Sequence, residues 1–253
     1  MNKIFKASLV ALATAFGASS TAQAGLFDFD PAEGNFYASG FGGIAIPFDS
    51  DFEGVQDPAA GVGGVAGADA NVEAEFSNDV YFGGAIGARL PFKYWKYFQP
   101  RLELEISRYE ADVDGGSFNG GDQIFSGDQS ATFFLINNSS EIVWREDQRV
   151  VPYFGGGIGV ADFDTDIQYF PNNGVATAPV FAAQGSDTAF TTLSTIGANF
   201  KATPKFDVYI EGRYLKTYGL DADRVALPSG GFNASLDDDP DGITITGGIR
   251  YNF

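Results

Sequence analysis

The chain has 253 residues, of which 44% are apolar and 19% are charged, and its 33 acidic residues outnumber its 15 basic ones. The apolar fraction excludes a disordered chain, and the excess of acid argues against nucleic acid as a partner, because phosphate binding requires Lys and Arg. The sequence contains no Cys and no His, which excludes disulfides, zinc–thiolate sites and His-dependent catalysis.

The first 24 residues predict an export signal rather than part of the fold. Lys3 and Lys6 make the N-terminus positive, a short apolar run follows at 7–16, and Ala22-Gln23-Ala24 has the small-x-small pattern of a cleavage site before Gly25. We expect Sec-type export and cleavage near Ala24/Gly25. No later apolar run is long enough for a transmembrane helix, so a membrane-spanning form of this chain would be a β-barrel.

The remainder of the chain predicts strands, because segments of about ten residues alternate between apolar and polar side chains. In one of them Leu102, Leu104 and Ile106 alternate with charged residues, so the strand has one apolar and one polar face. The expected strands are 35–46, 80–90, 99–110, 131–144, 150–162, 189–202, 206–218 and 242–253. We predict an all-β fold: an eight-stranded antiparallel up-and-down transmembrane β-barrel over 35–253, preceded by a periplasmic segment at 25–34.

The connections between these strands alternate between short and long, as in outer-membrane barrels with short periplasmic turns and long extracellular loops. The expected long acidic loops are 47–79, 111–129, 163–188 and 219–241. The first of these is either a surface loop or an extension of strands beyond the membrane. The sequence leaves open whether 60–78 or 174–184 contains further strands.

Aromatic residues cluster next to the expected short turns, which is typical of the aromatic girdle at a membrane interface. They are Phe92, Tyr94, Trp95, Tyr97, Phe98, Trp144, Phe200, Phe206, Tyr251 and Phe253.

The polar face of the strands predicts a charged barrel interior of five acids and four bases. These residues are Arg89, Arg101, Glu103, Glu105, Glu141, Asp207, Glu211, Arg213 and Arg250. An eight-stranded barrel is only wide enough inside for side chains, and unpaired charges there are costly. We therefore expect a plug in which Glu103, Glu105 and Glu211 pair with Arg101, Arg213 and Arg250, making the barrel a poor conductor. Small residues make room for these long side chains: Gly83, Gly87, Gly155, Gly157 and Gly159.

One acidic segment has the spacing of half a calcium loop. Asp237, Asp239 and Asp241 stand at alternate positions before Gly242, but Gly248 occupies the place of the bidentate Glu. A second triplet, Asp162, Asp164 and Asp166, lacks the Gly. We favour solvated acidic turns, with no cofactor beyond Ca²⁺ or Mg²⁺ loosely bound between acidic loops and anionic lipopolysaccharide.

Three late segments carry a family resemblance: Pro152–Val160, Val208–Tyr214 and Gly247–Phe253. They are similar to strands of the outer-membrane β-barrel family typified by the transmembrane domain of outer-membrane protein A, although Gly212 stands where that family has Tyr. The resemblance implies an outer-membrane location in a Gram-negative-type bacterium. It also implies that the barrel-assembly machinery recognises the terminal strand through Ile249, Tyr251 and Phe253.

The resemblance fixes no single activity. We expect a monomer in contact with outer-membrane lipid and lipopolysaccharide, with a structural or surface-interaction role and no enzymatic activity. A small porin or channel for small solutes is the first alternative. A soluble exported barrel that binds an apolar ligand is the second, and the charged inner face argues against it.

Overall fold

The computed structural model describes residues 27–29, 35–47, 50–145 and 147–253. The expected signal peptide, 1–24, lies outside these residues, as does all of 25–34 except 27–29. The described chain forms a 14-stranded antiparallel sheet. Within it, no helix is long and apolar enough to cross a membrane.

The strands vary from three to 22 residues in length. They are β1 (Phe27–Phe29), β2 (Asn35–Pro47), β3 (Ser50–Gln56), β4 (Val72–Phe76), β5 (Asp79–Arg89), β6 (Phe92–Tyr94), β7 (Phe98–Phe118), β8 (Gly121–Ile142), β9 (Val150–Pro171), β10 (Phe181–Lys201), β11 (Phe206–Tyr218), β12 (Leu220–Ala226), β13 (Gly231–Asp238) and β14 (Asp241–Asn252).

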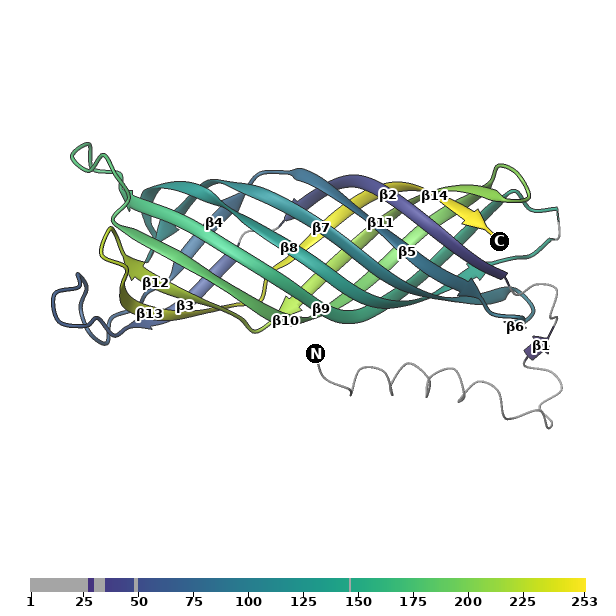
Figure 1. Cartoon of the computed structure of the whole chain (residues 1–253), viewed down its shortest axis with the longest axis horizontal. Helices are drawn as coiled ribbons and strands as arrows, with labels where there is room; N and C mark the ends of the chain where they lie inside the picture. The colour runs from purple at the N-terminus through teal and green to yellow at the C-terminus, as the bar shows by residue number, and fades with distance from the viewer. Residues whose placement is uncertain (1–26, 30–34, 48–49, 146) are drawn as a thin grey trace.

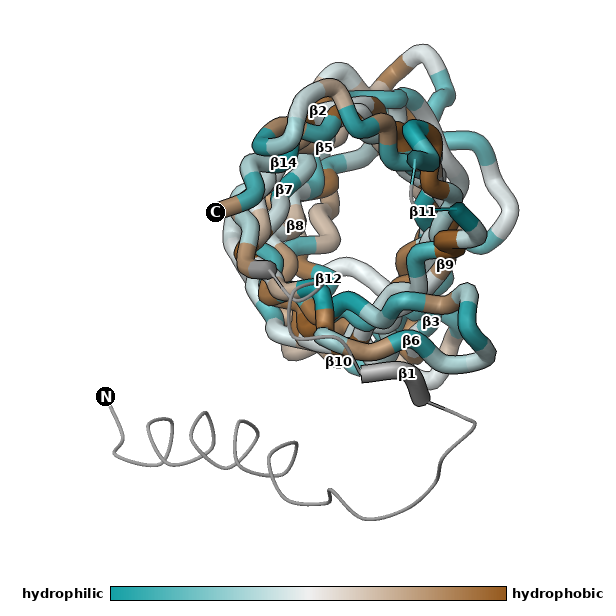
Figure 2. Tube along the Cα trace, turned by 90° about the vertical axis from the view of Figure 1, so that its right-hand side faces the viewer, coloured by the Kyte–Doolittle hydropathy of each residue, from teal (hydrophilic) through white to brown (hydrophobic). Residues whose placement is uncertain are grey.

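The strands close into a tube through two circuits that share β7, β8, β9 and β10 (Figures 1 and 2). We call the circuit at the right of Figure 1 the lower circuit and the one at the left the upper circuit. The lower circuit runs β2–β5–β7–β8–β9–β10–β11–β14 and returns to β2. The upper circuit replaces the other four strands by β4, β12, β13 and β3. We call the part built by the upper circuit the outer extension. Each strand of the two circuits pairs with a neighbour on both of its sides, so neither circuit ends in an open sheet edge.

The outer extension corrects the expectation of long loops. Much of 111–129, 163–188, 219–241 and 47–79 is strand, and β7 and β8 are joined only by Asn119 and Gly120. Both of these residues have positive φ, as a tight hairpin turn requires. The acidic residues of these stretches alternate with small or apolar ones, such as Ala111 and Val113, which point inward and are buried. The segments 60–78 and 174–184 add no strand beyond β4 and the start of β10.

The outer surface is divided into two zones along the strands. On β9 the outward residues Phe154, Ile158 and Val160 are followed by outward Asp162 and Asp164. Around the lower circuit the exposed apolar side chains form what we call the apolar belt: Ile44, Val80, Phe82, Ile86, Leu104, Ile106, Phe134, Ile136, Phe154, Ile158, Val160, Phe190, Ile196, Val208, Ile210, Ile243, Ile245 and Ile249. The outer extension instead exposes carboxylates beyond this belt.

The interior is also layered. The charged side chains lie inside the lower circuit, and an aromatic layer lies beyond them. The outer extension is filled by an apolar core that includes Phe52, Val72, Ile167, Leu220 and Leu236, each no more than 1% exposed. The lower circuit is thus apolar outside and charged inside. The outer extension has the opposite arrangement, an apolar core and a charged surface, as in water-soluble proteins.

Candidate functional site

The structure brings all nine residues of the expected charged interior together inside the lower circuit. They come from β5, β7, β8, β11 and β14, and four of them, Arg101, Glu141, Arg213 and Arg250, are at most 2% exposed. Burial of this many charges requires close pairing, because a buried charge without a partner is strongly destabilising.

Glu141 is the centre of the larger cluster. Its carboxylate accepts from Arg89 Nε at 2.8 Å and from Arg101 Nη1 at 2.9 Å, and Arg250 Nη1 lies 3.5 Å away. Arg89 and Arg101 stand directly opposite each other on β5 and β7, a repulsive placement that the shared carboxylate offsets. Arg89 also donates to Asp207 at 2.9 Å.

Glu103 lies beside this cluster and adds negative charge to it. One of its oxygens is 3.5 Å from Arg101 Nη2 and the other is 3.6 Å from Arg250 Nη2. Glu141 and Glu103 thus link the guanidinium groups of Arg89, Arg101 and Arg250 across β5, β7, β8 and β14.

Arg213 is the centre of the second cluster. Its Nη2 atom lies 2.7 and 2.8 Å from the two oxygens of Glu105 and donates to both, and its Nη1 atom donates to the Tyr81 hydroxyl at 3.0 Å. Hydrogen bonds between two charged groups are shorter and stronger than neutral ones. Tyr81 and Ser107 add hydrogen bonds around the same carboxylate, and Glu211 lies 3.8 Å from Arg213 Nε.

Three buried tyrosines join the clusters, and the alternation argument did not single them out. The Tyr153 hydroxyl donates to Glu211 at 2.8 Å, and the Arg101 guanidinium stacks 4.6 Å over the Tyr153 ring. Arg250 lies between the rings of Tyr37 and Tyr209, at 4.6 and 5.1 Å. Cation–π contacts of this kind stabilise guanidinium groups away from water.

Glycine makes room for these rings as well as for charged side chains. A Cβ on Gly87 would lie 2.6 Å from the Tyr37 ring and 2.7 Å from Glu103, and one on Gly248 would lie 2.4 Å from the Tyr209 ring. A small inward residue directly facing an aromatic one across the sheet is the sequence signal that could have found the tyrosines.

The charged layer leaves little free space. A cavity of about 20 Å³ lies among Arg101, Glu103, Glu105, Arg213 and Arg250. That volume accommodates roughly one water molecule. The Nε atoms of Arg101, Arg213 and Arg250 are buried and have no hydrogen-bond partner among the described residues, so a water in the cavity would have donors to bind.

An aromatic layer closes the interior above the charges. Phe41 stacks on Tyr81 at 5.9 Å, and Phe133 contacts Tyr81, Tyr109 and Phe163 with centroid distances of 6.0–6.4 Å. Arg213 lies 5.3 Å from both Phe41 and Tyr81 and so links this layer to the charges.

Arg224 occupies the far end of the outer extension, and no sequence pattern singled it out. Its guanidinium lies 3.8 Å from the Phe181 ring centroid and 4.2 Å from that of Phe118, and it donates to Tyr169 and Asn233. It is 2% exposed, and no carboxylate of the described residues forms an ion pair with it at 4 Å or less. The aromatic faces supply its electrostatic stabilisation.

The acidic triplet considered for calcium spans the short connection between β13 and β14: Asp237 lies on β13, Asp239 in the connection and Asp241 at the start of β14. Asp237 faces Asp221 across β12 and β13, Asp239 accepts from the Gly219 N–H at 2.7 Å, and Asp241 accepts from the Tyr214 hydroxyl. The part of the chain that the structure describes holds no group of three or more acidic side chains placed to bind a metal.

The residues of the expected assembly signal lie on the outer side of β14 and at the residue after it. Ile249 is 57% exposed and Phe253 is 74% exposed, and the Tyr251 ring packs between Phe206 and Phe253. Aromatic residues also gather at the turn before β7, where half-buried Tyr94 and Phe98 contact each other and exposed Trp95.

No protein-family model and no curated protein matches this sequence. Among solved structures, the chain is similar to the outer-membrane protease OmpT from Escherichia coli, with 13% identity, a TM-score of 0.51, and coverage of 93% of this chain and 100% of that one. Neisserial surface protein A matches with 11% identity and a TM-score of 0.39, covering 86% of this chain and 97% of the other. Ail of Yersinia pestis matches with 11% identity and a TM-score of 0.34, covering 87% and 99%. At 13% identity the likeness to OmpT shows the fold alone: this chain has the antiparallel β-barrel fold of that protein.

Proposed function

We propose that the protein is a surface-exposed outer-membrane barrel in which the eight strands of the lower circuit cross the membrane and the charged layer keeps the interior closed. The carrying observation is the inverted lower half, where Ile and Phe side chains face outward while Arg101, Arg213 and Arg250 are buried inside. A water-soluble barrel would place the large apolar residues inside and the charges outside.

The outer extension would then stand outside the membrane. Its outward carboxylates, such as Asp112, Asp162 and Asp164, begin where the apolar belt ends, and its own core is apolar. These features support a role in surface interaction or in the mechanical integrity of the envelope. Loosely held Ca²⁺ or Mg²⁺ between the carboxylates and anionic lipopolysaccharide would reduce the repulsion between them.

The closed interior supports a structural or recognition role over a channel for small solutes. Two ion-pair clusters, three tyrosines and the aromatic layer succeed one another along the tube, with one cavity of about 20 Å³ among the charges. Removing Glu141 would leave Arg89, Arg101 and Arg250 with only Asp207 and Glu103 as acidic partners, so disrupting the layer is costly.

The remaining elements of the proposal concern export and assembly. The N-terminal signal supports Sec-type export. Exposed Ile249 and Phe253, together with half-buried Tyr251, lie at the C-terminal end of the chain and support recognition by the barrel-assembly machinery. The absence of His from the sequence supports a non-enzymatic role. Because both circuits are closed without a partner strand, we propose that the protein is a monomer.

The membrane assignment is tested on a single strand. Trp95 and Trp144 are replaced by Phe, and one Trp is introduced at Ile158, in the apolar belt, or at Asp164, on the same outward face of β9. After refolding into vesicles that contain brominated lipids, Ile158→Trp should be strongly quenched and Asp164→Trp should not. Equal fluorescence from the two variants would contradict the membrane assignment, provided that both show a heat-modifiable shift in gel mobility.

A further inference from the structure

The lower end of the barrel, at the right of Figure 1, carries a row of exposed bases on the three short turns after β6, β8 and β10. We call these residues the basic arc: Lys96, Arg145, Arg149, Lys201 and Lys205. Within the part of the chain that the structure describes, none of the five forms an ion pair at 4 Å or less, whereas the four arginines of the charged layer are all paired. The arc is therefore exposed positive charge that the described residues leave unneutralised.

The composition of the turns shows the same excess of positive charge. The segments 91–97, 143–149 and 201–205 together hold six basic and two acidic residues, a net charge of +4 in a chain whose net charge is −18. Lys93 is the sixth base, and we leave it out of the arc because Asp28 of β1 stands opposite it on β6.

Backbone hydrogen bonds hold the three turns next to one another along the rim. The Val143 N–H donates to the Tyr97 carbonyl at 2.7 Å and so joins the first turn to the second. The Lys201 N–H donates to the Arg149 carbonyl at 2.9 Å and joins the second to the third. The arc thus follows the rim from β6 to β11 without interruption.

The turns are also ordered internally, so the bases are presented in fixed places. Buried Gln148 closes the second turn through three hydrogen bonds to its backbone, and Thr203 Oγ1 accepts from the Lys205 N–H at 3.3 Å in the third. In the first turn Trp95 and Lys96 have φ of +49° and +66°, a region that favours glycine. Side chains kept at such strained positions are concentrated at functional sites.

The arc adjoins the apolar belt at the depth expected for lipid headgroups. Lys205 places its ammonium 5.8 Å from the Tyr251 ring. Aromatic side chains gather at the border between hydrocarbon and water, and long basic side chains reach from there to the headgroups. The exposed aromatic residues beside the arc are Trp95, Tyr97, Trp144, Phe200 and Phe206.

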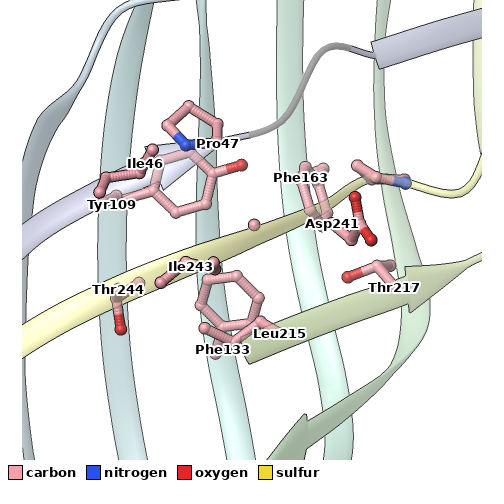
Figure 3. A pocket seen from close by; sticks show the side chains of 13 residues that line it. Ile46, Pro47, Tyr109, Phe133, Phe163, Leu215, Thr217, Asp241, Ile243 and Thr244 are labelled. Atoms are coloured by element: carbon pink, nitrogen blue, oxygen red, sulfur yellow. The ribbon is translucent and has the colours of Figure 1, made fainter. Parts of the chain in front are cut away.

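The charge reverses at the other border of the belt. β9 begins beside Arg149 and carries outward Asp162 where the belt ends. On β14, Figure 3 shows Asp241 next to Ile243 at this same border, and Lys216 of β11 stands opposite that one carboxylate. The lower end of the barrel therefore attracts anionic headgroups, and the carboxylates of the outer extension repel them.

We propose that the basic arc binds the phosphate groups of anionic phospholipids in the leaflet that surrounds the lower end of the barrel. This inference rests on the proposed membrane location. Lipid phosphate suits the arc better than a soluble anion does, because the bases are spread along the rim and adjoin the aromatic residues that border the belt. Each Lys or Arg close to an anionic lipid surface strengthens the attraction about fivefold.

The two tryptophans of the chain, Trp95 and Trp144, both lie on this rim and report on the lipid beside it. The protein is refolded into phosphatidylcholine vesicles that contain a minor fraction of either brominated phosphatidylglycerol or brominated phosphatidylcholine. Because brominated acyl chains quench nearby indole fluorescence, the ratio of the two quenching constants measures the local preference for the anionic lipid. We expect a ratio of about five at low salt. The ratio should fall toward one in ~1 M salt, where the Debye length is about 3 Å.

Charge variants locate the preference on the rim. Replacing Arg149, Lys201 and Lys205 together by Gln should at least halve the ratio, whereas Arg149→Lys with Lys201→Arg and Lys205→Arg should keep it. Arg149→Gln alone should lower it, and its matched control Arg108→Gln, which removes an exposed base from the outer extension, should not. Each variant is compared after its heat-modifiable gel mobility has been verified.

The failures of the two proposals are distinguishable. Equal quenching by the two brominated lipids in the parent protein overturns the basic arc, as does a preference that survives in the Gln variant or in high salt. An equal loss in Arg149→Gln and Arg108→Gln also overturns it, because the preference would then follow the net charge of the whole protein. Quenching by neither lipid overturns the proposed membrane location itself.

Discussion

The central carboxylate of the charged layer gives the sharpest test of the energetics. In Glu141→Gln the side chain keeps its shape but loses the negative charge that faces Arg89, Arg101 and Arg250. Breaking a buried ion pair typically costs about 3–5 kcal/mol. Asp207 and Glu103 still neutralise part of the exposed positive charge, so we expect the lower end, about 3 kcal/mol of unfolding free energy.

The matched control is Glu110→Gln on the outer extension. Glu110 pairs with Arg108 at 3.7 Å, but the two side chains are 64% and 43% exposed, so this change should cost no more than about 1 kcal/mol. Both variants are unfolded with urea from lipid vesicles, with gel mobility as the readout. If the loss in Glu141→Gln comes from stranded positive charge, adding Arg101→Met should recover part of it. Equal losses in the two single variants, or strictly additive losses in the double variant, would refute the reasoning.

Three further predictions concern separate regions. Arg224→Met removes the cation that lies on the aromatic rings and its hydrogen bond to Asn233, whose side-chain amide in turn donates to the Gly63 carbonyl. Hydrogen exchange should therefore accelerate at the Val65 N–H, which donates to Gln56 Oε1 in the same loop; unchanged exchange would refute a clamping role for Arg224. Burial raises the pKa of Asp238 to about 6 from its usual 3.8, so between these two pH values the folded state holds a proton that the unfolded state releases. The resulting contribution to stability is fully present below pH ~4 and is lost as the pH rises through 6. Asp238→Asn should flatten that fall in the urea midpoint, and an identical pH profile would contradict it. Phe253→Ala should reduce the amount of barrel assembled in outer membranes. Because Phe253 is 74% exposed, the unfolding free energy of the refolded variant should stay within about 0.5 kcal/mol of the parent value. Full assembly in cells would contradict an assembly role.

Strand alternation carried most of the fold prediction. The segments expected at 35–46, 80–90, 206–218 and 242–253 agree with β2, β5, β11 and β14 to within one residue at each end. The same alternation is enough to place Arg101, Glu105 and Arg213 on the inner face, where they lie. It carries no information about which inner residues meet, because contacts across a barrel depend on the stagger between strands.

The failures have physical causes as well. The segments now seen as β12, β13 and the upper parts of β7 to β10 resemble loops because they are rich in Asp and Gly. Their inward positions hold small residues such as Ala111, Ala182 and Ala222, which give a weak apolar signal although they are buried. Glu141 could be placed inside but not at the centre of three guanidinium groups, and Arg224 has an aromatic rather than an acidic environment, which charge pairing does not reveal.

The closed interior is tested most directly by planar-bilayer conductance of the refolded protein, after its heat-modifiable mobility has been verified. Two ion-pair clusters and an aromatic layer across the tube predict no stable single-channel current in the parent protein. A steady conductance of nanosiemens size would contradict the account, because it would mean that the charged layer does not close the barrel, and a channel for small solutes would then be the better description.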